Sequence, residues 1–269
     1  MPELPEVEAV VRSLRPLVRG KKIRRCRVLH AIAVRPQQPA ELRRAIEGRR
    51  VEAVARRGKY LLLRLDRGCV ILHFRLDGQL VWFDTKQICG HIDVAFEFGD
   101  GVLGFVDRRH FGRVHWLARP DDSRGIRALG VEPLSAAFTL RRFTELLAAS
   151  RRPLKLLLMD QTKIAGLGNI YSNEALWRAR LHPRRRADRV APQEARRLHK
   201  TIVDVLRRAL ECCTHPAPDF RDRAWWFEGL ERILRVYGRK GERCRRCGGR
   251  IRRSELSGRA SYFCPGCQR

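Results

Sequence analysis

Apolar side chains follow a helical period over the first twenty residues of the chain. They recur at i, i+3, i+4 and i+7 spacing, and the run ends at Gly20. Pro5 stands near the start, where a proline is tolerated because that backbone amide has no intrahelical partner. The pattern predicts an amphipathic helix with one buried face. Its apolar positions are Val7, Val10, Val11, Leu14, Leu17 and Val18.

The hydrophobic period changes to two between about residues 23 and 118, which is typical of β-strands. Turn signals such as Asp77-Gly78 and Gly99-Asp100-Gly101 separate the alternating runs. Six or more closely spaced strands predict an antiparallel β-sandwich, with the first helix at its flank. The predicted strands are 60–65, 69–74, 79–83, 91–98, 101–107 and 113–118.

Helical patterns return in the second half of the chain, and a short segment rich in glycine and cysteine follows them. The predicted helices cover 139–149, 153–159, 170–179 and 192–210. We therefore expect an α+β multidomain protein. Its expected parts are a β-sandwich domain at 1–120, a linker at 121–138, a helical domain at 139–237 and a small C-terminal domain at 238–269.

The charge of the chain narrows the choice of partner. Its 269 residues include 57 Lys+Arg against 29 Asp+Glu, a formal net charge of +28. Such an excess favours nucleic acid, and the alternative is a solvated, arginine-rich surface. No run reaches the roughly 20 apolar residues that span a bilayer, and no signal segment is evident. We expect a cytoplasmic monomer with no membrane contact.

Four cysteines near the C-terminus form two C-x2-C pairs, Cys244 with Cys247 and Cys264 with Cys267, with sixteen residues between the pairs. This spacing predicts one tetrahedral Zn²⁺ site. Four thiolates leave no open position, so the zinc would be structural. The alternative is a pair of redox motifs. The other cysteines are expected to be small buried residues; they are Cys26, Cys69, Cys89, Cys212 and Cys213.

Two segments of the second half could hold a phosphate. Gly258 marks a turn between the cysteine pairs, which would place Arg259 at the tip of a zinc-held hairpin. Gly166 and Gly168 precede a predicted helix that starts near Asn169, and backbone amides at such a helix start attract anions. The alternatives are an ordinary surface charge and an interhelical turn.

The segment "FVDRRHFGRVHW" places Phe111 close to Arg109 at a strand end. An exposed aromatic ring beside an arginine can enter a base stack while the arginine holds the orphaned base or a phosphate. The alternative is a core phenylalanine.

The N-terminus combines an imino acid with carboxylates. Removal of Met1 would leave Pro2 with a free secondary amine, and an α-amino group has a pKa of roughly 7.7–8.0. Such an amine can attack a sugar C1′ or an aldehyde to form a Schiff base. Glu3 and Glu6 could then transfer protons beside it. The alternative is that the acids only cap the helix.

Three motifs together resemble the formamidopyrimidine-DNA glycosylase family, which includes endonuclease VIII. They are "MPELPEVE", "LMDQTKIAGLGNIYSNEAL" and "CRRCGGRI…SGRASYFCPGCQ", supported by "LGVEPL" at 129–134 and "VYGRKGERC" at 236–244. They lie in the family's order and cover essentially the whole chain. The resemblance implies a helix–two-turn–helix domain, a zinc-finger β-hairpin with one structural Zn²⁺, and damaged or abasic double-stranded DNA as partner.

The resemblance also implies a reaction. The family flips out a damaged base, most often an oxidised purine, cuts its glycosidic bond and nicks the strand by β,δ-elimination. The implied catalytic residues are Pro2, the nucleophile; Glu3, the general acid/base; Glu6; Lys59; and Arg259. The implied DNA-binding residues are His73, Leu76, Arg109, Phe111, Lys155, Gly168, Asn169, Tyr237 and Arg259.

The chain departs from the family pattern in two places. In "HFRLDG", Leu76 replaces a methionine, and Arg75 and Asp77 put charges where small residues are usual. In 211–234, Cys212, Cys213, Trp225 and Trp226 replace a glycine-rich stretch. A different lesion is therefore one alternative. The others are a non-catalytic binder of damaged DNA and a zinc-ribbon RNA-binding protein.

Overall fold

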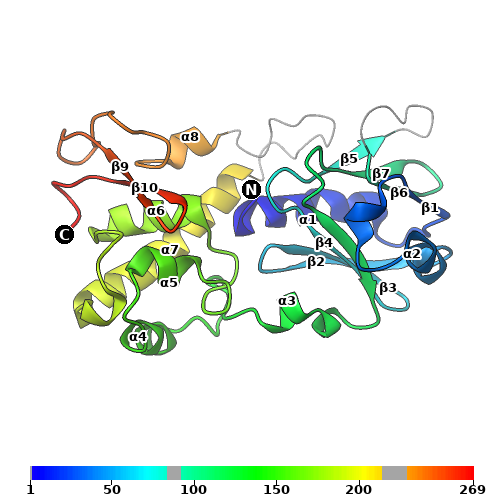
Figure 1. Cartoon of the computed structure of the whole chain (residues 1–269), viewed down its shortest axis with the longest axis horizontal. Coiled ribbons are helices and arrows are strands. Elements are labelled where there is room, and N and C mark those ends of the chain that lie inside the picture. The colour runs from blue at the N-terminus through cyan, green and yellow to red at the C-terminus, as the bar shows by residue number, and fades with distance from the viewer. Residues whose placement is uncertain (1, 84–91, 214–228) are drawn as a thin grey trace. The chain divides into compact units, whose positions relative to one another are not determined.

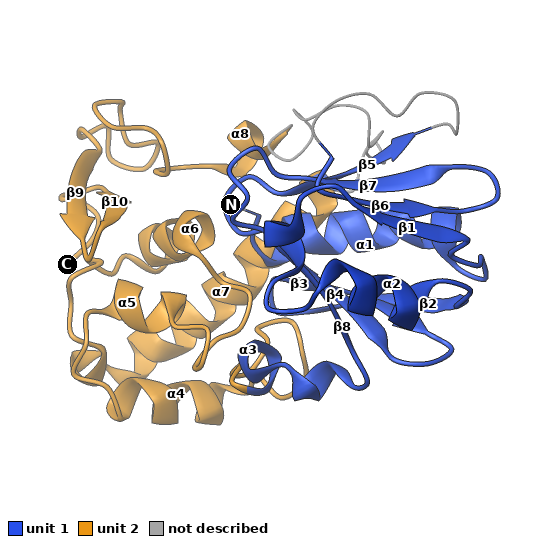
Figure 2. Ribbon diagram, turned by 45° about the vertical axis from the view of Figure 1, so that its right-hand side comes forward, with its two compact units in different colours: residues 1–127, 213–228 blue, residues 128–212, 229–269 orange. Residues whose placement is uncertain are grey.

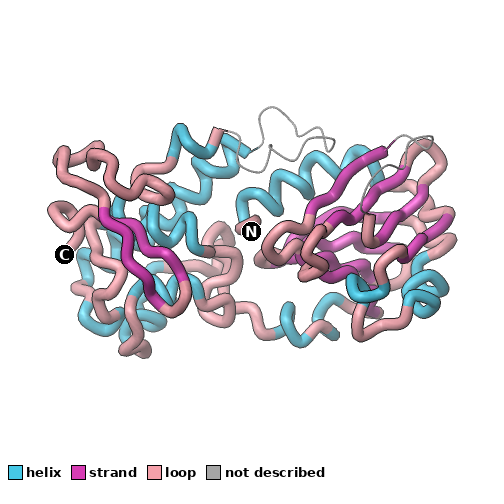
Figure 3. Tube along the Cα trace, turned by 45° about the horizontal axis from the view of Figure 1, so that its top comes forward, coloured by secondary structure: helices cyan, strands magenta, loops and turns pink. Residues whose placement is uncertain are grey.

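The chain divides into two compact units. The computed structural model describes residues 2–83, 92–213 and 229–269. Residues 2–127 and Cys213 fall in the first unit, and residues 128–212 and 229–269 fall in the second (Figure 2). The strands of the two large sheets lie in the first unit, and helices with a single hairpin make up most of the second (Figures 1 and 3).

Two four-stranded antiparallel sheets form the first unit, so the predicted β-sandwich is confirmed. One sheet has the order β1 (Arg25–Val28), β6 (Val94–Glu97), β7 (Val102–Val106), β5 (Gln79–Phe83). The other has the order β2 (Val51–Arg57), β3 (Tyr60–Leu65), β4 (Cys69–His73), β8 (Arg113–Leu117). Phe74, which follows β4, and Phe105 of β7 are both buried, and their rings lie 6.3 Å apart.

The predicted first helix is α1 (Leu4–Val18), which contacts β2 and β3. Its apolar positions Val7, Val10, Val11, Leu14 and Val18 are buried as expected. Burying such side chains contributes about 1.5–3 kcal/mol each, which fixes the start of the chain against the sheet. The first residues after Met1 are thereby held in one place.

The second unit contains the other predicted helices. They are α4 (Leu140–Ala148), α5 (Leu154–Met159), α6 (Asn169–Ala179) and α7 (Pro192–Cys213), with the short 3-10 helix η3 (Ala187–Arg189) and α8 (Leu230–Ile233). The C-terminal hairpin consists of β9 (Arg252–Leu256) and β10 (Arg259–Phe263). Ser257 and Gly258 join the strands with φ of 49° and 70°, so the turn expected at Gly258 is present.

The sequence reasoning missed several elements of the first unit. The segment from residue 23 was expected to contain only strands, yet it includes η1 (Ala31–Val34) and α2 (Pro39–Ile46). The expected connection from Pro120 contains η2 (Pro120–Asp122) and α3 (Arg124–Arg127). Among the described residues, no helix has the length and apolar character that a membrane crossing needs. Cys89, Trp225 and Trp226 lie outside the described residues.

Candidate active site

Pro2, Glu3 and Glu6 are brought together at the start of α1. All three side chains are buried, and the two carboxylates are each 1% exposed. The backbone N–H of Glu3 donates to Oε2 of Glu6 at 2.7 Å. Glu6 therefore holds the backbone that carries both Pro2 and Glu3. Helix capping and a catalytic cluster are thus not exclusive here, because one hydrogen bond serves both.

Cys213, the last residue of α7, also lies against this cluster. Its Sγ is 3.9 Å from Oε1 of Glu6 and can donate a weak hydrogen bond to that carboxylate. The thiol is 5% exposed. Sequence reasoning treated Cys213 only as a small buried residue, and the position of a helix end next to residue 6 has no signal in the sequence pattern.

Lys59 and His73 lie at one end of the β2–β3–β4 sheet. Gly58, with φ of 57°, and Lys59 form the turn between β2 and β3, and Lys59 is 6% exposed. Tyr60 pairs with His73 across β3 and β4, and their rings meet edge to face at 4.6 Å. The sheet register therefore brings the expected catalytic lysine close to the expected DNA-binding histidine.

The environment of His73 keeps its imidazole neutral. Burial, together with the positive charges of Arg75 and Lys59, lowers the pKa of His73 from 6.5 to about 3. The backbone N–H of Arg75 donates to Nδ1 at 3.0 Å. The ring proton must then sit on Nε2, so His73 offers a fixed hydrogen-bond donor at physiological pH.

Replacing His73 with glutamine is expected to flatten the pH dependence of stability. The unfolded imidazole takes up a proton below about pH 6.5, but the folded one does so only near pH 3. Wild-type stability should therefore fall by about 1–2 kcal/mol from pH 6.5 to pH 5, a loss that the variant lacks. Urea unfolding of both proteins at the two pH values measures it, and an equal pH dependence would contradict it.

Two loops of the first unit place Leu76, Arg109 and Phe111 at the surface. The Phe111 side chain is 49% exposed, so it is not the core phenylalanine of the alternative interpretation. The guanidinium of Arg109 lies over the Phe111 ring, 5.5 Å from its centroid, and forms an ion pair with Asp77. Asp77 is one of the chain's departures from the family pattern. Leu76, in the same turn as Asp77, is half-buried.

Asp107 fixes the turn that carries Arg109 and Phe111. Its Oδ1 accepts from the backbone N–H of Arg109 at 3.1 Å, and its Oδ2 accepts from that of Gly112 at 2.6 Å. A Cβ at Gly112 would lie 2.4 Å from Cζ of Phe105, so only glycine fits there. The turn is therefore built to present the two side chains rather than to bury them.

In the second unit, the helix start near Asn169 and the hairpin of Arg259 are linked. Gly168 caps α6, and Asn169 is its first residue. Nδ2 of Asn173 donates to the carbonyl of Asn169 at 2.6 Å, and its Oδ1 accepts from the backbone N–H of Tyr262 at 2.9 Å. Asn173, which sequence reasoning missed, thus joins the two expected phosphate-binding elements.

Lys155 is completely buried and supports the same hairpin. Its Nζ donates to the carbonyl of Ala260 at 2.5 Å and to Oγ of Ser261 at 2.8 Å. Arg259, the exposed neighbour of these residues, begins β10 directly after the turn. Lys155 was expected to bind DNA; its position indicates that it holds the strand from which Arg259 projects.

Glu174 of α6 fixes the segment that contains Tyr237. Its buried carboxylate accepts from the backbone N–H groups of Arg235 and Val236 at 2.9 Å and of Tyr237 at 3.0 Å. Burial raises the pKa of Glu174, and these three amides oppose the rise. The Tyr237 ring then meets Tyr262 of β10 edge to face at 5.2 Å.

Glu174→Gln is expected to destabilise the second unit by about 2–3 kcal/mol, because an amide oxygen cannot replace a carboxylate that accepts several backbone hydrogen bonds. Glu145→Gln is the matched control, since Glu145 is 61% exposed and pairs only with Arg141 one turn away. That control should change stability by less than about 1 kcal/mol. Thermal unfolding of the two variants gives the comparison, and equal midpoints would contradict the role of Glu174.

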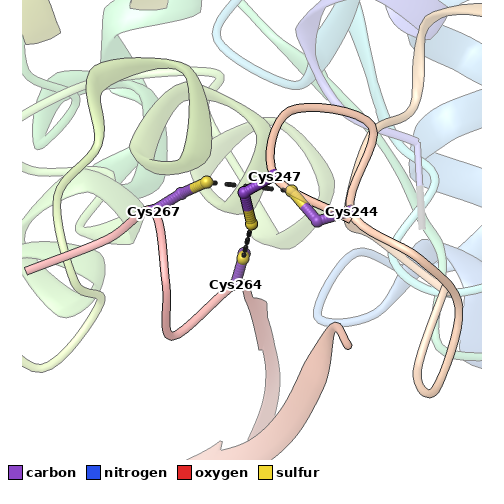
Figure 4. Close-up of side chains that lie close together, drawn as sticks. All are labelled: Cys244, Cys247, Cys264 and Cys267. Carbon is purple, nitrogen blue, oxygen red and sulfur yellow. Dashed lines mark hydrogen bonds between the residues drawn. The ribbon is translucent and has the colours of Figure 1, made fainter. Parts of the chain in front are cut away.

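The four C-terminal cysteines converge on one point (Figure 4). Their Sγ atoms all lie within 4.8 Å of one another, with Cys244–Cys267 at 3.9 Å and Cys247–Cys264 at 3.4 Å. Four thiolates bound to one tetrahedral Zn²⁺ are about 3.8 Å apart, so the group fits this ion and leaves it no open position. Cys26, Cys69 and Cys213 are buried as expected, while Cys212 is half-buried.

The cysteine cluster packs against α6. Cys244 and Cys264 share a buried cluster with Trp177, Val236 and Ile251. Cζ of Arg246 lies 4.1 Å from the Trp177 ring centroid, and its Nη1 donates to the Trp177 carbonyl at 3.0 Å. The metal site therefore fixes the hairpin to the same helix that begins at Asn169.

Three family models match the chain in order. The N-terminal domain of formamidopyrimidine-DNA glycosylase matches residues 1–114, its H2TH domain matches 129–216, and the zinc finger found in FPG and IleRS matches 241–269. The chain belongs to the formamidopyrimidine-DNA glycosylase family. The resemblance read from the three motifs is thereby confirmed, as are the zinc finger and the structural zinc that its four cysteines can bind.

Curated members of the formamidopyrimidine-DNA glycosylase family match over the full length. The formamidopyrimidine-DNA glycosylase of Pelotomaculum thermopropionicum is 41% identical, covering 100% of this chain and 99% of the relative. That of Methylococcus capsulatus is 40% identical, covering 100% of both. The chain is accordingly a DNA glycosylase of base excision repair.

Solved structures show the same fold. The Lactococcus lactis Fpg in complex with abasic-site DNA superposes with a TM-score of 0.91 at 30% identity, over 99% of both chains. A complex of the same protein with DNA containing an oxidised pyrimidine gives 0.91 at 31% identity, over 100% of both chains. The expected α+β architecture with a helix–two-turn–helix domain and zinc-finger hairpin is confirmed.

Proposed function

We propose that this glycosylase excises an oxidised purine through an imine on Pro2 and then cuts the strand by β,δ-elimination. The observation that carries the proposal is the buried cluster of Pro2, Glu3 and Glu6 at the start of α1, fixed by the 2.7 Å hydrogen bond from the Glu3 amide to Glu6. It requires removal of Met1, because an amide nitrogen on Pro2 could not act as a nucleophile.

In this proposal the deprotonated Pro2 nitrogen attacks C1′ of the damaged nucleotide. The base leaves and takes a proton from Glu3, and an iminium joins the sugar to the enzyme. Loss of the C2′ proton then expels the 3′ phosphate, and a second elimination expels the 5′ phosphate. Glu6 acts through position, since it holds the backbone of Glu3.

The DNA contacts follow from the exposed groups of each unit. Arg259 and Asn169, joined through Asn173, would grip the phosphate of the flipped nucleotide, and Lys155 would hold the strand of Arg259. Arg109 and Phe111 would enter the gap in the base stack. His73 would donate from Nε2 to a backbone phosphate oxygen.

The lesion is the part of the proposal that depends most on this chain's own residues. Structures of the Lactococcus lactis protein include oxidised-pyrimidine and Fapy-dG DNA. Asp77 and Arg75 add charge beside Leu76, so an oxidised pyrimidine or another damaged base is the second candidate. The curated relatives named above are bacterial, and we propose that the enzyme works as a monomer in the cytoplasm, where bacterial DNA lies.

Borohydride trapping tests the chemistry. The protein is incubated with a duplex that carries one abasic site, reduced, digested and analysed by peptide mass spectrometry. An adduct on an N-terminal peptide that begins at Pro2 supports the imine and shows that Met1 is removed. Tight binding without an adduct would instead favour a non-catalytic binder of damaged DNA. The same assay over a panel of damaged bases identifies the lesion.

A further inference from the structure

Two histidines and an aspartate from distant parts of the sequence meet at one end of a sheet in the first unit. His30 follows β1, Asp93 precedes β6, and His110 follows β7. These three strands are neighbours, and Val28 of β1 pairs with Val94 of β6. The antiparallel register therefore brings the end of β1, the start of β6 and the end of β7 to the same edge. The backbone N–H of His30 donates to the Asp93 carbonyl at 3.2 Å, which ties two of the three residues together.

The side chains converge as well. His30, Asp93 and His110 each offer a ligand atom, and these atoms lie within 4.8 Å of one another. Nδ1 of His110 is 2.7 Å from Oδ1 of Asp93, and the rings of His30 and His110 are 4.8 Å apart. In the part of the chain that the structure describes, only this group and the four cysteines bring three or more such ligands together.

The surroundings of Asp93 resemble the support that a metal ligand receives. Its side chain is 2% exposed, and its Oδ2 accepts from the backbone N–H of Asp107 at 2.8 Å. That bond orients the carboxylate and leaves Oδ1 toward the histidines, as outer partners of metal ligands do. His30 is exposed, so an ion can reach the group from solvent.

We propose that His30, Asp93 and His110 form a second metal site, for a divalent transition ion such as Zn²⁺, Ni²⁺ or Co²⁺. Two imidazoles and one carboxylate are the donor set that these borderline ions accept, with water completing the coordination. Ligands of one tetrahedral ion at these bond lengths are about 3.3 Å apart, so His110 and Asp93 would separate by less than 1 Å on binding. The ion takes the place of the hydrogen bond between them.

The site is separate from the zinc finger and from the groups to which the catalytic proposal assigns chemistry. It has a direct mechanical consequence, because His110 stands between Arg109 and Phe111. An ion there would fasten this turn to the ends of β1 and β6. Backbone amides of residues 107–112 should then exchange with solvent more slowly when the ion is bound.

Metal content of the full-length, zinc-loaded protein tests the proposal without DNA. After equilibrium dialysis at micromolar free Zn²⁺, the wild type should hold two ions per chain, while His30→Ala and His110→Gln should hold one. Each substitution should weaken the second site at least about 10-fold. His115→Ala is the matched control, because His115 belongs to the same unit and hydrogen-bonds to the Arg35 carbonyl instead. It should keep both ions.

Cobalt distinguishes this site from the cysteines. Co²⁺ added to the zinc-loaded wild type should give ligand-field absorption without the thiolate charge-transfer bands that cysteine ligands produce, and His30→Ala should not show it. One ion per chain in the wild type, a second ion that binds only at millimolar concentration, or a second ion kept by both histidine variants would each overturn the proposal. His30 is exposed, so its variant tests the ligand and not the fold.

Discussion

Glu3→Gln is expected to lower the rate of base excision by about 10²–10⁴-fold while DNA affinity stays within about 3-fold of wild type. The glutamine can no longer give a proton to the leaving base or remove one from the sugar. Its size and its place beside Pro2 are unchanged, and the backbone hydrogen bond from residue 3 to Glu6 does not involve the altered side chain. Single-turnover excision from a lesion-containing duplex measures the rate.

Glu8→Gln is the control for this experiment. Glu8 lies on the same helix, one turn further along than its start, and pairs with Arg12 and Arg56 at 3.2 Å. It should retain an excision rate close to wild type. A rate for Glu3→Gln that matches the Glu8 control would remove Glu3 from the reaction. Equal loss of affinity and rate would indicate a role in binding instead.

Cys264→Ala, or removal of zinc by a strong chelator, is expected to weaken binding of lesion DNA by at least about 100-fold, because one loss removes the hairpin support of several charged contacts. Cys264 is buried against Trp177 and Ile251, so without the metal the hairpin loses its attachment to α6. The other helices have their own core, which includes Phe143, Leu147 and Leu198. Far-UV circular dichroism should therefore change little.

Two comparisons separate the metal's effect from a general loss of structure. Cys212→Ser alters a half-buried thiol outside the cluster and should bind DNA as the wild type does. Arg259→Ala, with zinc retained, removes only the exposed side chain of the hairpin and should account for much of the loss. If chelated protein still bound lesion DNA tightly, the proposed place of Arg259 on a zinc-held hairpin would be wrong.

Elements with a long, regular pattern were predictable from the sequence. The valine and leucine stripe of α1 and the alternation of β3, β4, β5, β7 and β8 appear where they were expected, since each pattern matches one buried face. The eight-residue helix α2 was missed because it is too short to show a period and lies among strands. Its start at Pro39, with Glu41 accepting from the Gln38 amide at 3.0 Å, was the available signal.

Side-chain partnerships were harder to foresee than side-chain roles. The cysteine spacing predicted its own geometry because all four ligands lie close in sequence. Asn173 and Glu174, in contrast, act on backbone amides 89 and 61 or more residues away, and nothing in a helix sequence marks such partners. The meeting of His30, Asp93 and His110 depends on strand order, which periodicity alone does not determine.

The unequal exposure of the four cysteines has a consequence for the lifetime of the finger. Cys244 and Cys264 are buried and Cys267 is half-buried, but Cys247 is exposed. An incoming chelator or oxidant must therefore meet the Cys247 sulfur first, and the other three cannot be released until that bond has opened. The durability of the folded finger is then governed by the exchange rate of one ligand, so two proteins with equal zinc affinity could lose DNA binding at very different speeds.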